Sequence, residues 1–517
     1  MNGKNKIIVL FLVTILSVAL GFVKESVIVY RLGATWQADV FVFASNMPIV
    51  LFSAIGSVIS TTFMPLYTDI RLKFSNNEAN SFASLFLKYV LAVSIFVIIL
   101  GMIFPDKLIG LMAPGILKNN YENIYLIVRI MLSSLLFLGL AYVYSGILNS
   151  YKDVVITSSI QIPMHVMIIV SMMIAYKNIG LVGAICVTAL GSVFQMLMMF
   201  TKARKRGVRY RKKTTLSKKY MRKAIKMIIP MIIGVMSYQI ILIISSSLAS
   251  RMGEGSITTL NLANKLNTAS YSTIGYLLVI VIYPVLAEYA AIDDYKSLNR
   301  LVSKGIIVSA LLMLPVSILM FFLSKDIVMF LFGYGKFSAE KVLKTSEILK
   351  YYSIGLVFWA IKDVLNRTYY SLKDTKTSMY NGIITVLVNL ILSLILITKF
   401  KEVGLAMAST ISSIASVILL IARLKAINIV INYRYIKKSL IKIIIAILGM
   451  FFIITVFNWL GIFNDNNRIF IILKMVVYSM ASIIVYFLIL CILKLKEIKI
   501  FTSKFKRRKV ERSGKDD

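Results

Sequence analysis

Residues 202–223 read KARKRGVRYRKKTTLSKKYMRK and contain twelve Lys and Arg residues without one acidic residue. Apolar runs lie on both sides of this stretch, and most have about the 20 residues that a helix needs to cross a membrane. Backbone polar groups in lipid must be satisfied internally, so continuous apolar runs of this length are expected to be helices. The stretch therefore predicts a basic connector between two groups of membrane-spanning helices.

The composition excludes the main soluble classes. Of the 517 residues, 59% are hydrophobic and 16% are charged, with a mean hydropathy of +0.84. A soluble domain is about 45–50% apolar, and a disordered chain is far more polar. The net charge of +37 would suggest nucleic-acid binding in a soluble protein. Here we assign it to loops on one side of a membrane, and we expect no nucleic-acid partner.

Fourteen apolar runs predict an all-α integral membrane fold of about 14 transmembrane helices. An even number places both termini on one side. Lys and Arg concentrate in the loops on that side and in the tail from Lys494, which predicts cytoplasmic termini and attraction to anionic lipids at the cytoplasmic face. The runs are 7–30, 38–66, 82–104, 124–149, 154–176, 179–200, 224–250, 257–287, 302–324, 345–371, 376–398, 403–422, 440–461 and 469–493.

The two halves of the chain resemble each other at three places in the same order. The offsets between the matched segments are 219, 221 and 224 residues, which predicts two parallel six-helix lobes around a central cleft that opens to alternate sides. The matches are Ile55-Gly56 with Ile274-Gly275, Ser150–Asp153 with Ser371–Asp374, and Gly180-Leu181 with Gly404-Leu405. The predicted parts are an N-terminal lobe (1–200), a basic linker (201–223), a C-terminal lobe (224–424), an extra helix pair (437–495) and a basic tail (496–517).

Five ionisable residues within the predicted spans are the candidate binding residues. Charges deep in a membrane need a partner, a wet cavity or a function. Lys24, Lys265 and Lys362 would together line a cationic cavity, which suits a phosphate or diphosphate group. We expect Glu25 and Asp39 to act as counter-ions that hold the lysines.

The alternative interpretation of these residues is local ion pairing without a ligand. Lys24 could pair with Glu25 or Asp39, and Lys362 could pair with Asp363. Adjacent residues of a helix do not face each other, so we expect the neighbouring pairs not to form.

Histidine and cysteine counts exclude several kinds of site. The chain has one His and two Cys, too few for a disulfide framework or a Cys/His metal site. We expect no metal, no cofactor and no enzyme activity.

The chain resembles the MurJ/MviN family of lipid II flippases, within the superfamily of multidrug, oligosaccharidyl-lipid and polysaccharide exporters. The resemblance runs in order over nearly the whole chain. The residues that carry it are GFVKESVIVYRLGATWQADVF (21–41), MAPG (112–115), GILNS (146–150), LFGYGKFS (331–338) and YYSLKDTKT (369–377).

The resemblance implies translocation of an undecaprenyl-diphosphate-linked saccharide across the bacterial plasma membrane. It places Lys24-Glu25 on the family's basic-acidic pair, Asp39 on its span 2 aspartate, Lys265 on its cavity arginine and Lys362 on its span 10 lysine. It also implies that the last two helices form a groove for the lipid tail.

Three rival functions remain open from the sequence. The family's mid-span arginine has no counterpart at Leu51–Ser53, which favours a flippase for capsule or exopolysaccharide repeat units. The second rival is a cation-coupled multidrug exporter, which would need an acidic cavity, whereas the predicted cavity is basic. The third rival is a non-transport scaffold in a cell-wall complex, and the buried charges argue against it because a scaffold does not need them.

Overall fold

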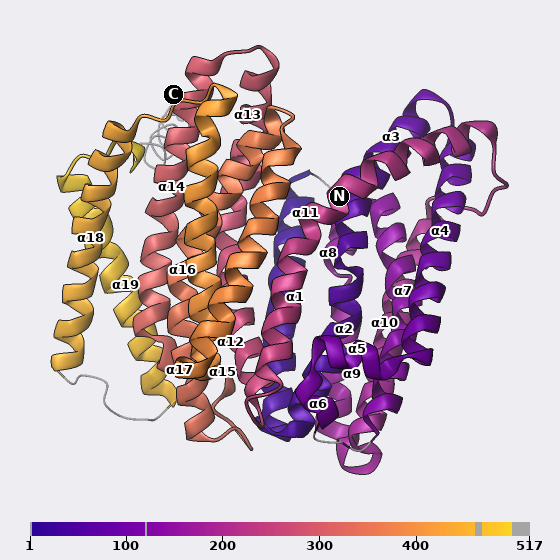
Figure 1. Cartoon of the computed structure of the whole chain (residues 1–517), viewed down its shortest axis with the longest axis horizontal. Coiled ribbons are helices and arrows are strands. Elements are labelled where there is room, and N and C mark those ends of the chain that lie inside the picture. Colours follow the sequence, from indigo (N-terminus) through magenta and orange to yellow (C-terminus); the bar gives the residue numbers. More distant parts are fainter. Residues whose placement is uncertain (1–2, 119–120, 122, 461–467, 499–517) are drawn as a thin grey trace, which may run out of the picture. The chain divides into compact units, whose positions relative to one another are not determined.

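The computed structural model describes residues 3–118, 121, 123–460 and 468–498. Every regular element among them is a helix (Figure 1). The chain divides into two compact units. Unit 1 comprises residues 1–261 and 331–341, and unit 2 comprises residues 262–330 and 342–517. The prediction of an all-α membrane fold is confirmed, while residues 499–517 of the predicted basic tail lie outside the described residues.

Unit 1 contains the helices of the first half of the chain and the start of α12. They are α1 (Gly3–Leu32), α2 (Trp36–Val58), η1 (Ile59–Phe63), α3 (Met64–Lys73), α4 (Asn76–Ile103), α5 (Pro105–Met112), α6 (Pro114–Lys118), α7 (Ile124–Ser150), α8 (Val154–Ser158), α9 (Ile162–Val170), η2 (Ser171–Ala175), α10 (Tyr176–Lys205) and α11 (Thr215–Ala249).

Unit 2 contains most of the remaining helices. The elements after α11 are α12 (Ser256–Ser270), η3 (Tyr271–Gly275), α13 (Tyr276–Ala291), α14 (Tyr295–Phe322), α15 (Ser324–Phe332), α16 (Ala339–Ser371), α17 (Thr375–Arg423), η4 (Leu424–Ile427), α18 (Tyr433–Trp459), α19 (Arg468–Ile492) and η5 (Lys496–Ile498).

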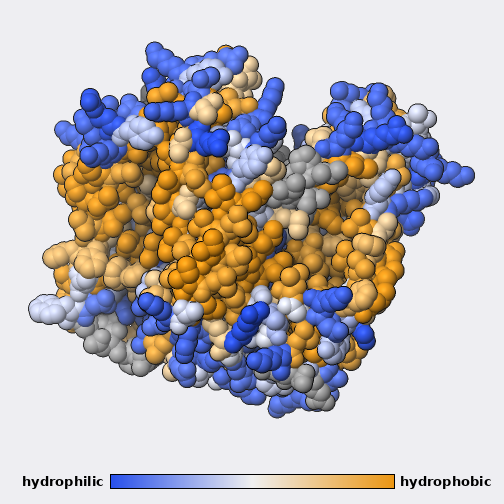
Figure 2. All heavy atoms as spheres, in the orientation of Figure 1, coloured by the Kyte–Doolittle hydropathy of each residue, from blue (hydrophilic) through white to orange (hydrophobic). Residues whose placement is uncertain are grey.

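Large apolar side chains are exposed along the middle of the helices. Phe11 and Phe452 are each 65% exposed. Figure 2 shows hydrophobic residues (orange) over the middle of the helices and hydrophilic residues (blue) at their ends. Within the described residues, eight helical stretches are long and apolar enough to cross a membrane. The chain is therefore a multi-pass membrane protein, and the total of fourteen spans stays a prediction.

Two of these stretches, of 52 and 53 residues, fold back on themselves. A straight 53-residue helix would measure about 80 Å, far more than the roughly 30 Å hydrocarbon core. In α17 the backbone leaves the helical conformation at Lys401, with φ 49°. A Cβ on Gly404 would lie 2.5 Å from the Leu396 carbonyl oxygen, so the chain reverses there. Asn381 then donates to Ser416 across the two arms, at 2.6 Å.

The same reversal occurs in the first half of the chain, at Gly180 in α10, where φ is 62°. Gln195 donates to Gln161 across the two arms, at 3.4 Å. The two breaks occupy corresponding places in the predicted repeat. Tight reversals therefore divide stretches that would otherwise be far too long for one crossing.

The matched segments Ser150–Asp153 and Ser371–Asp374 form the same turn. Each follows a long helix, α7 or α16, and precedes the next helix, α8 or α17. Lys152 has φ 61° and Lys373 has φ 62°, both in the left-handed region. The internal similarity noted in the sequence thus corresponds to the same local backbone.

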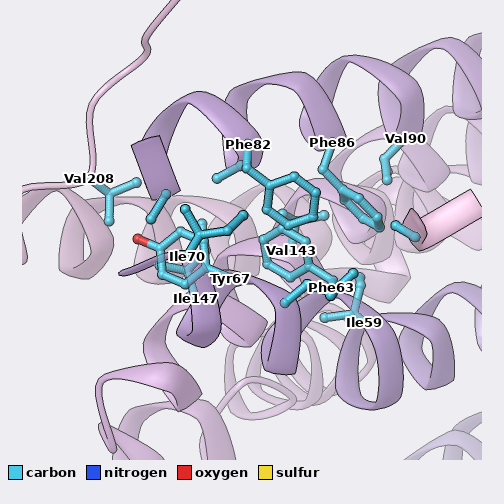
Figure 3. Packing of buried hydrophobic residues seen from close by; sticks show 14 of the residues in the cluster. Ile59, Phe63, Tyr67, Ile70, Phe82, Phe86, Val90, Val143, Ile147 and Val208 are labelled. Atoms are coloured by element: carbon cyan, nitrogen blue, oxygen red, sulfur yellow. The ribbon is translucent and has the colours of Figure 1, made fainter. Parts of the chain in front are cut away.

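An aromatic cluster holds one end of unit 1 together (Figure 3). Phe63 contacts Phe86 with ring centroids 4.6 Å apart, and it stacks on Phe82 at 5.5 Å. Tyr67 is fully buried and donates to Asn80 at 3.3 Å. These side chains come from η1, α3 and α4, so the cluster joins η1 and α3 to α4.

The last two helices of unit 2 pack closely on each other and on α14. In α18 a Cβ on Gly449 would lie 2.2 Å from the Ile489 side chain of α19. Tyr486 of α19 is buried and donates to the Leu311 carbonyl oxygen of α14 at 2.8 Å. The Gly449 contact brings the pair together, and the tyrosine attaches it to α14.

Candidate functional site

Lys24 and Glu25 lie in α1 and form an ion pair. The Lys24 Nζ atom is 2.7 Å from Glu25 Oε1, and the side chains are only 10% and 3% exposed. The expectation that neighbouring helical residues do not pair was wrong here. A lysine side chain is long enough to bend around the helix, and two charges away from water attract each other strongly. Lys24 therefore has a counter-ion on its own helix.

Asp39 lies in α2 and caps the N-terminus of α12. Its carboxylate accepts from the backbone N–H groups of Gly255 and Thr258 and from the Thr258 hydroxyl, each at 2.7 Å. Asp39 is 5% exposed. The first N–H groups of a helix have no partner within it, and a carboxylate satisfies them well. Asp39 therefore caps α12, and its role as a counter-ion of the lysines stays a prediction.

The capping is reciprocal. Glu254, immediately before α12, accepts from the backbone N–H of Trp36 at the start of α2, at 2.8 Å. Asp39 and Thr258 are 219 residues apart, the offset that separates Gly56 from Gly275 in the predicted repeat. The corresponding helices of the two halves thus cap each other with acidic side chains.

The segment LFGYGKFS lies against the C-terminal part of α1. Lys336 N donates to the Tyr30 carbonyl oxygen at 3.1 Å, and Ser26 donates to the Leu331 carbonyl oxygen at 2.6 Å. Gly335 has φ 62°, and a Cβ there would lie 2.3 Å from the Tyr30 oxygen. A larger residue does not fit this approach. Two of the stretches that carry the family resemblance therefore meet in unit 1.

Lys265 and Lys362 belong to unit 2 and are both half-buried. Asp363, which follows Lys362 in α16, accepts a hydrogen bond from the Tyr271 hydroxyl. Tyr271 packs edge-on against Trp359, with centroids 5.8 Å apart. The Lys362 ammonium forms no hydrogen bond or ion pair with the described residues. The alternative in which Lys362 pairs with Asp363 is therefore not realised.

Glu402 is a buried acidic residue that the sequence pattern did not indicate. It is 1% exposed and lies 2.5 Å from the Lys344 Nζ atom of α16. In the sequence Glu402 stands beside Lys399 and Lys401, a pattern typical of an exposed loop. Glu402 is buried because α17 reverses next to it. In the local sequence, Gly404 is the one residue that indicates this reversal.

The five candidate residues are thus brought together only in part. Lys24 and Glu25 form an ion pair in unit 1, where Asp39 caps α12. Lys265 and Lys362 belong to unit 2. In the described part of the chain, no group of three or more His, Cys, Asp or Glu side chains is placed to hold a metal ion.

Known proteins resemble this chain over almost its full length. A "Probable lipid II flippase MurJ" of Buchnera aphidicola subsp. Baizongia pistaciae is 26% identical over 493 residues, covering 93% of this chain and 95% of that protein. One of Borreliella burgdorferi is 27% identical over 497 residues, again covering 93% and 95%.

Solved structures show the same fold. A lipid II flippase MurJ in an inward closed conformation superposes with a TM-score of 0.76 at 21% identity, covering 96% of this chain and 99% of that one. An inward-facing multidrug resistance MATE family transporter gives a TM-score of 0.66 at 14% identity, with 81% and 98% covered. The family model described as "Lipid II flippase MurJ" matches residues 28–495. The chain belongs to the lipid II flippase MurJ family.

Proposed function

We propose that this chain translocates lipid II, the undecaprenyl-diphosphate-linked peptidoglycan precursor, from the inner to the outer leaflet of the bacterial plasma membrane for cell wall biosynthesis. The observation that carries the proposal is the family match over residues 28–495. The relatives described above are all named for lipid II, which favours this cargo over capsule or exopolysaccharide units. The proposed mechanism is alternating access, with both termini in the cytoplasm.

The diphosphate of the cargo is the group that the lysines would bind. An ammonium group is a compact cation that suits phosphate oxygens. Lys362 is the strongest candidate, because its side chain is half-buried and its ammonium forms no hydrogen bond or ion pair with the described residues, although Asp363 attracts it. An unpaired cation away from bulk water gains more from an arriving anion than a paired one does. Lys265 would add a second cation, and the lipid tail would lie beside α18 and α19.

Lys24 would take part by exchanging partners. Its ammonium is held by Glu25 at 2.7 Å in unit 1. A diphosphate that replaced Glu25 would have to compete with this pair, so Glu25 sets how readily Lys24 accepts the cargo. Asp39 would act as a positioning residue, because it holds the first turn of α12. The proposed substrate-binding set is thus Lys24, Lys265 and Lys362, with Glu25 as the ion-pair partner of Lys24 and Asp39 as the cap of α12.

The test uses the full-length chain in cells that depend on it. The measured quantity is the fraction of lipid II that a membrane-impermeant reagent can reach in the outer leaflet. We expect Lys362→Gln to lower the translocation rate at least about tenfold, the effect of losing one charge-assisted contact. Lys362→Arg should retain most of the rate, since it keeps the charge. The exposed Lys376 of the same unit provides the matched control, Lys376→Gln, which should behave as wild type.

Two results would contradict different parts of the proposal. Normal translocation by Lys362→Gln would remove this residue from the site while leaving the function intact. If depletion of the wild-type chain leaves outer-leaflet lipid II unchanged and traps capsule repeat units inside, the assigned cargo is wrong.

A further inference from the structure

A cavity of about 630 Å³ lies in unit 2 where α14 and α18 begin. Four basic residues line it: Lys296, Arg300, Lys304 and Lys496. We call this cavity the basic pocket. Lys265 and Lys362, the candidate residues of the same unit, are not among the described residues that line it.

Positive charge is concentrated at the basic pocket. Lys296, Arg300 and Lys304 follow one another at four-residue intervals, so they lie on one face of α14. Among the described residues, none of those that line the cavity is acidic. The N-terminal ends of α14 and α18 add the positive ends of two helix dipoles. Like charges gathered at this density repel one another, and an anion would relieve the repulsion.

The carboxylates near the basic pocket are already engaged. Glu497, next to Lys496, is buried and accepts a hydrogen bond from the Tyr435 hydroxyl. Asp294, just before α14, accepts from the Ser297 backbone N–H at 3.0 Å. Each of these two carboxylates thus makes a structural contact, although the Glu497 Oε2 atom has no hydrogen-bond partner among the described residues and Asp294 also attracts Lys296. The four basic residues that line the pocket still outnumber the two carboxylates.

Hydrogen bonds hold the walls of the basic pocket in place. Asn299 accepts from the backbone N–H of Val430 at 3.1 Å, and Ser303 accepts from that of Asn432 at 3.2 Å. The Asn432 side chain in turn accepts from Tyr435 N at 2.9 Å. These bonds attach the segment before α18 to α14. The cavity is therefore formed before any ligand arrives.

The basic pocket lies at the edge of the apolar surface. The continuous apolar part of α14 begins immediately after Lys304, and that of α18 begins after Lys442. Val430, which lines the cavity, is 61% exposed. A cation cluster at this level of a membrane protein meets lipid headgroups, whose phosphate is anionic and whose acyl chains cover the adjoining apolar helix surface.

We propose that the basic pocket binds the phosphate headgroup of an anionic phospholipid, a lipid distinct from the translocated cargo. The three basic side chains of α14 and Lys496 contact the phosphate oxygens, and the acyl chains lie along α14 and α18. The basic side chains would also bind inorganic phosphate. The adjoining apolar surface adds binding energy only for a lipid, because only a lipid has acyl chains to contact it.

The test measures lipid binding to the purified full-length chain in detergent by native mass spectrometry. Phosphatidylglycerol is titrated, with phosphatidylcholine as the neutral lipid and inorganic phosphate without lipid as the third probe. The variant is Lys296→Gln with Arg300→Gln and Lys304→Gln. The matched control removes three exposed charges from α11 in the other unit: Lys218→Gln with Lys219→Gln and Arg222→Gln.

We expect wild type and control to retain one phosphatidylglycerol molecule more than the pocket variant. The affinity of this molecule should fall at least about tenfold in the pocket variant, in line with the attraction of each basic residue for an anionic surface. Arg300→Gln alone, with less risk to folding, should give a smaller loss in the same direction.

Three outcomes overturn the proposal. Equal retention by the pocket variant and the control would show that the basic pocket is not a lipid site. Equal binding of phosphatidylcholine would remove the anion requirement. Inorganic phosphate that binds as tightly as phosphatidylglycerol would identify a soluble-anion site. None of these outcomes bears on lipid II translocation, which this measurement does not use.

Discussion

Asp39 in unit 1 and Lys362 in unit 2 are both ionisable residues within apolar helices, yet their surroundings differ. Asp39 accepts three hydrogen bonds of 2.7 Å from Gly255 and Thr258. Lys362 has no hydrogen-bond or ion-pair partner among the described residues. A buried charge that is fully satisfied stabilises the fold, whereas an unsatisfied one lowers stability unless a ligand arrives. The difference separates structural charges from charges available to a cargo.

The largest loss of stability is expected on substitution of Glu402. This residue forms a buried ion pair with Lys344 and so is, like Asp39, a buried charge with a partner. Glu402→Ala would leave the partly buried Lys344 without its counter-ion, and we expect a loss of about 3 kcal/mol. The measurement is reversible unfolding of the full chain in detergent. The double variant Lys344→Met with Glu402→Leu should recover most of the loss, because it removes both charges. A double variant as unstable as the single one would show that packing, and not the ion pair, is lost.

Asp39→Ala is expected to have the next largest effect. Two backbone N–H groups and the Thr258 hydroxyl would lose their acceptor, which costs about 2 kcal/mol. Asp39→Asn keeps one acceptor oxygen and should cost about half as much. The same unfolding assay measures both. Unchanged stability of Asp39→Ala would remove the capping role and return Asp39 to the list of ligand-binding residues.

The ion pair between Arg206 and Asp153 is more exposed than the pair between Lys344 and Glu402, so the two show how exposure changes the effect on stability. The guanidinium contacts both carboxylate oxygens at 2.5 Å, but the Arg206 side chain is 44% exposed. Solvent screens such a pair, so we expect Arg206→Ala to cost about 0.5 kcal/mol and the cost to shrink in high salt. A loss comparable to that of Glu402→Ala would contradict the view that burial decides the size of these effects.

Lys362→Gln should have the smallest effect on stability. Since the half-buried ammonium has no hydrogen bond or ion pair among the described residues, we expect its removal to leave stability unchanged or to raise it by about 0.5 kcal/mol. Paired with the loss of translocation described above, this result would separate function from folding at one residue. A loss of several kcal/mol would mean that Lys362 serves the fold as Asp39 does.

Much of the fold could be predicted from the sequence. Apolar length and the bias of basic residues depend on composition alone, so the membrane class and the helices follow from local sequence. The repeated segments Ser150–Asp153 and Ser371–Asp374 also predict their common turn, because a helix end with a left-handed residue is a local structure.

The candidate site could be predicted only in part. Lys24, Asp39 and Lys362 were recognisable as charges in apolar surroundings. The pairing of Lys24 with its neighbour was not, because periodicity describes where Cβ atoms point and not how far a lysine reaches. Glu402 was missed because its local sequence is typical of a loop.

Composition and the apolar runs determined by themselves that this chain is a helical membrane protein, and three repeated segments predicted its two similar halves. The tertiary structure alone decided which charges are satisfied. Asp39 accepts a hydrogen bond from Thr258, which lies 219 residues away in the sequence. Lys344 forms an ion pair with Glu402 because α17 reverses, and Lys362 forms no hydrogen bond or ion pair with the described residues. A helix is specified by its own residues, whereas the partner of a buried charge is specified by how distant helices pack.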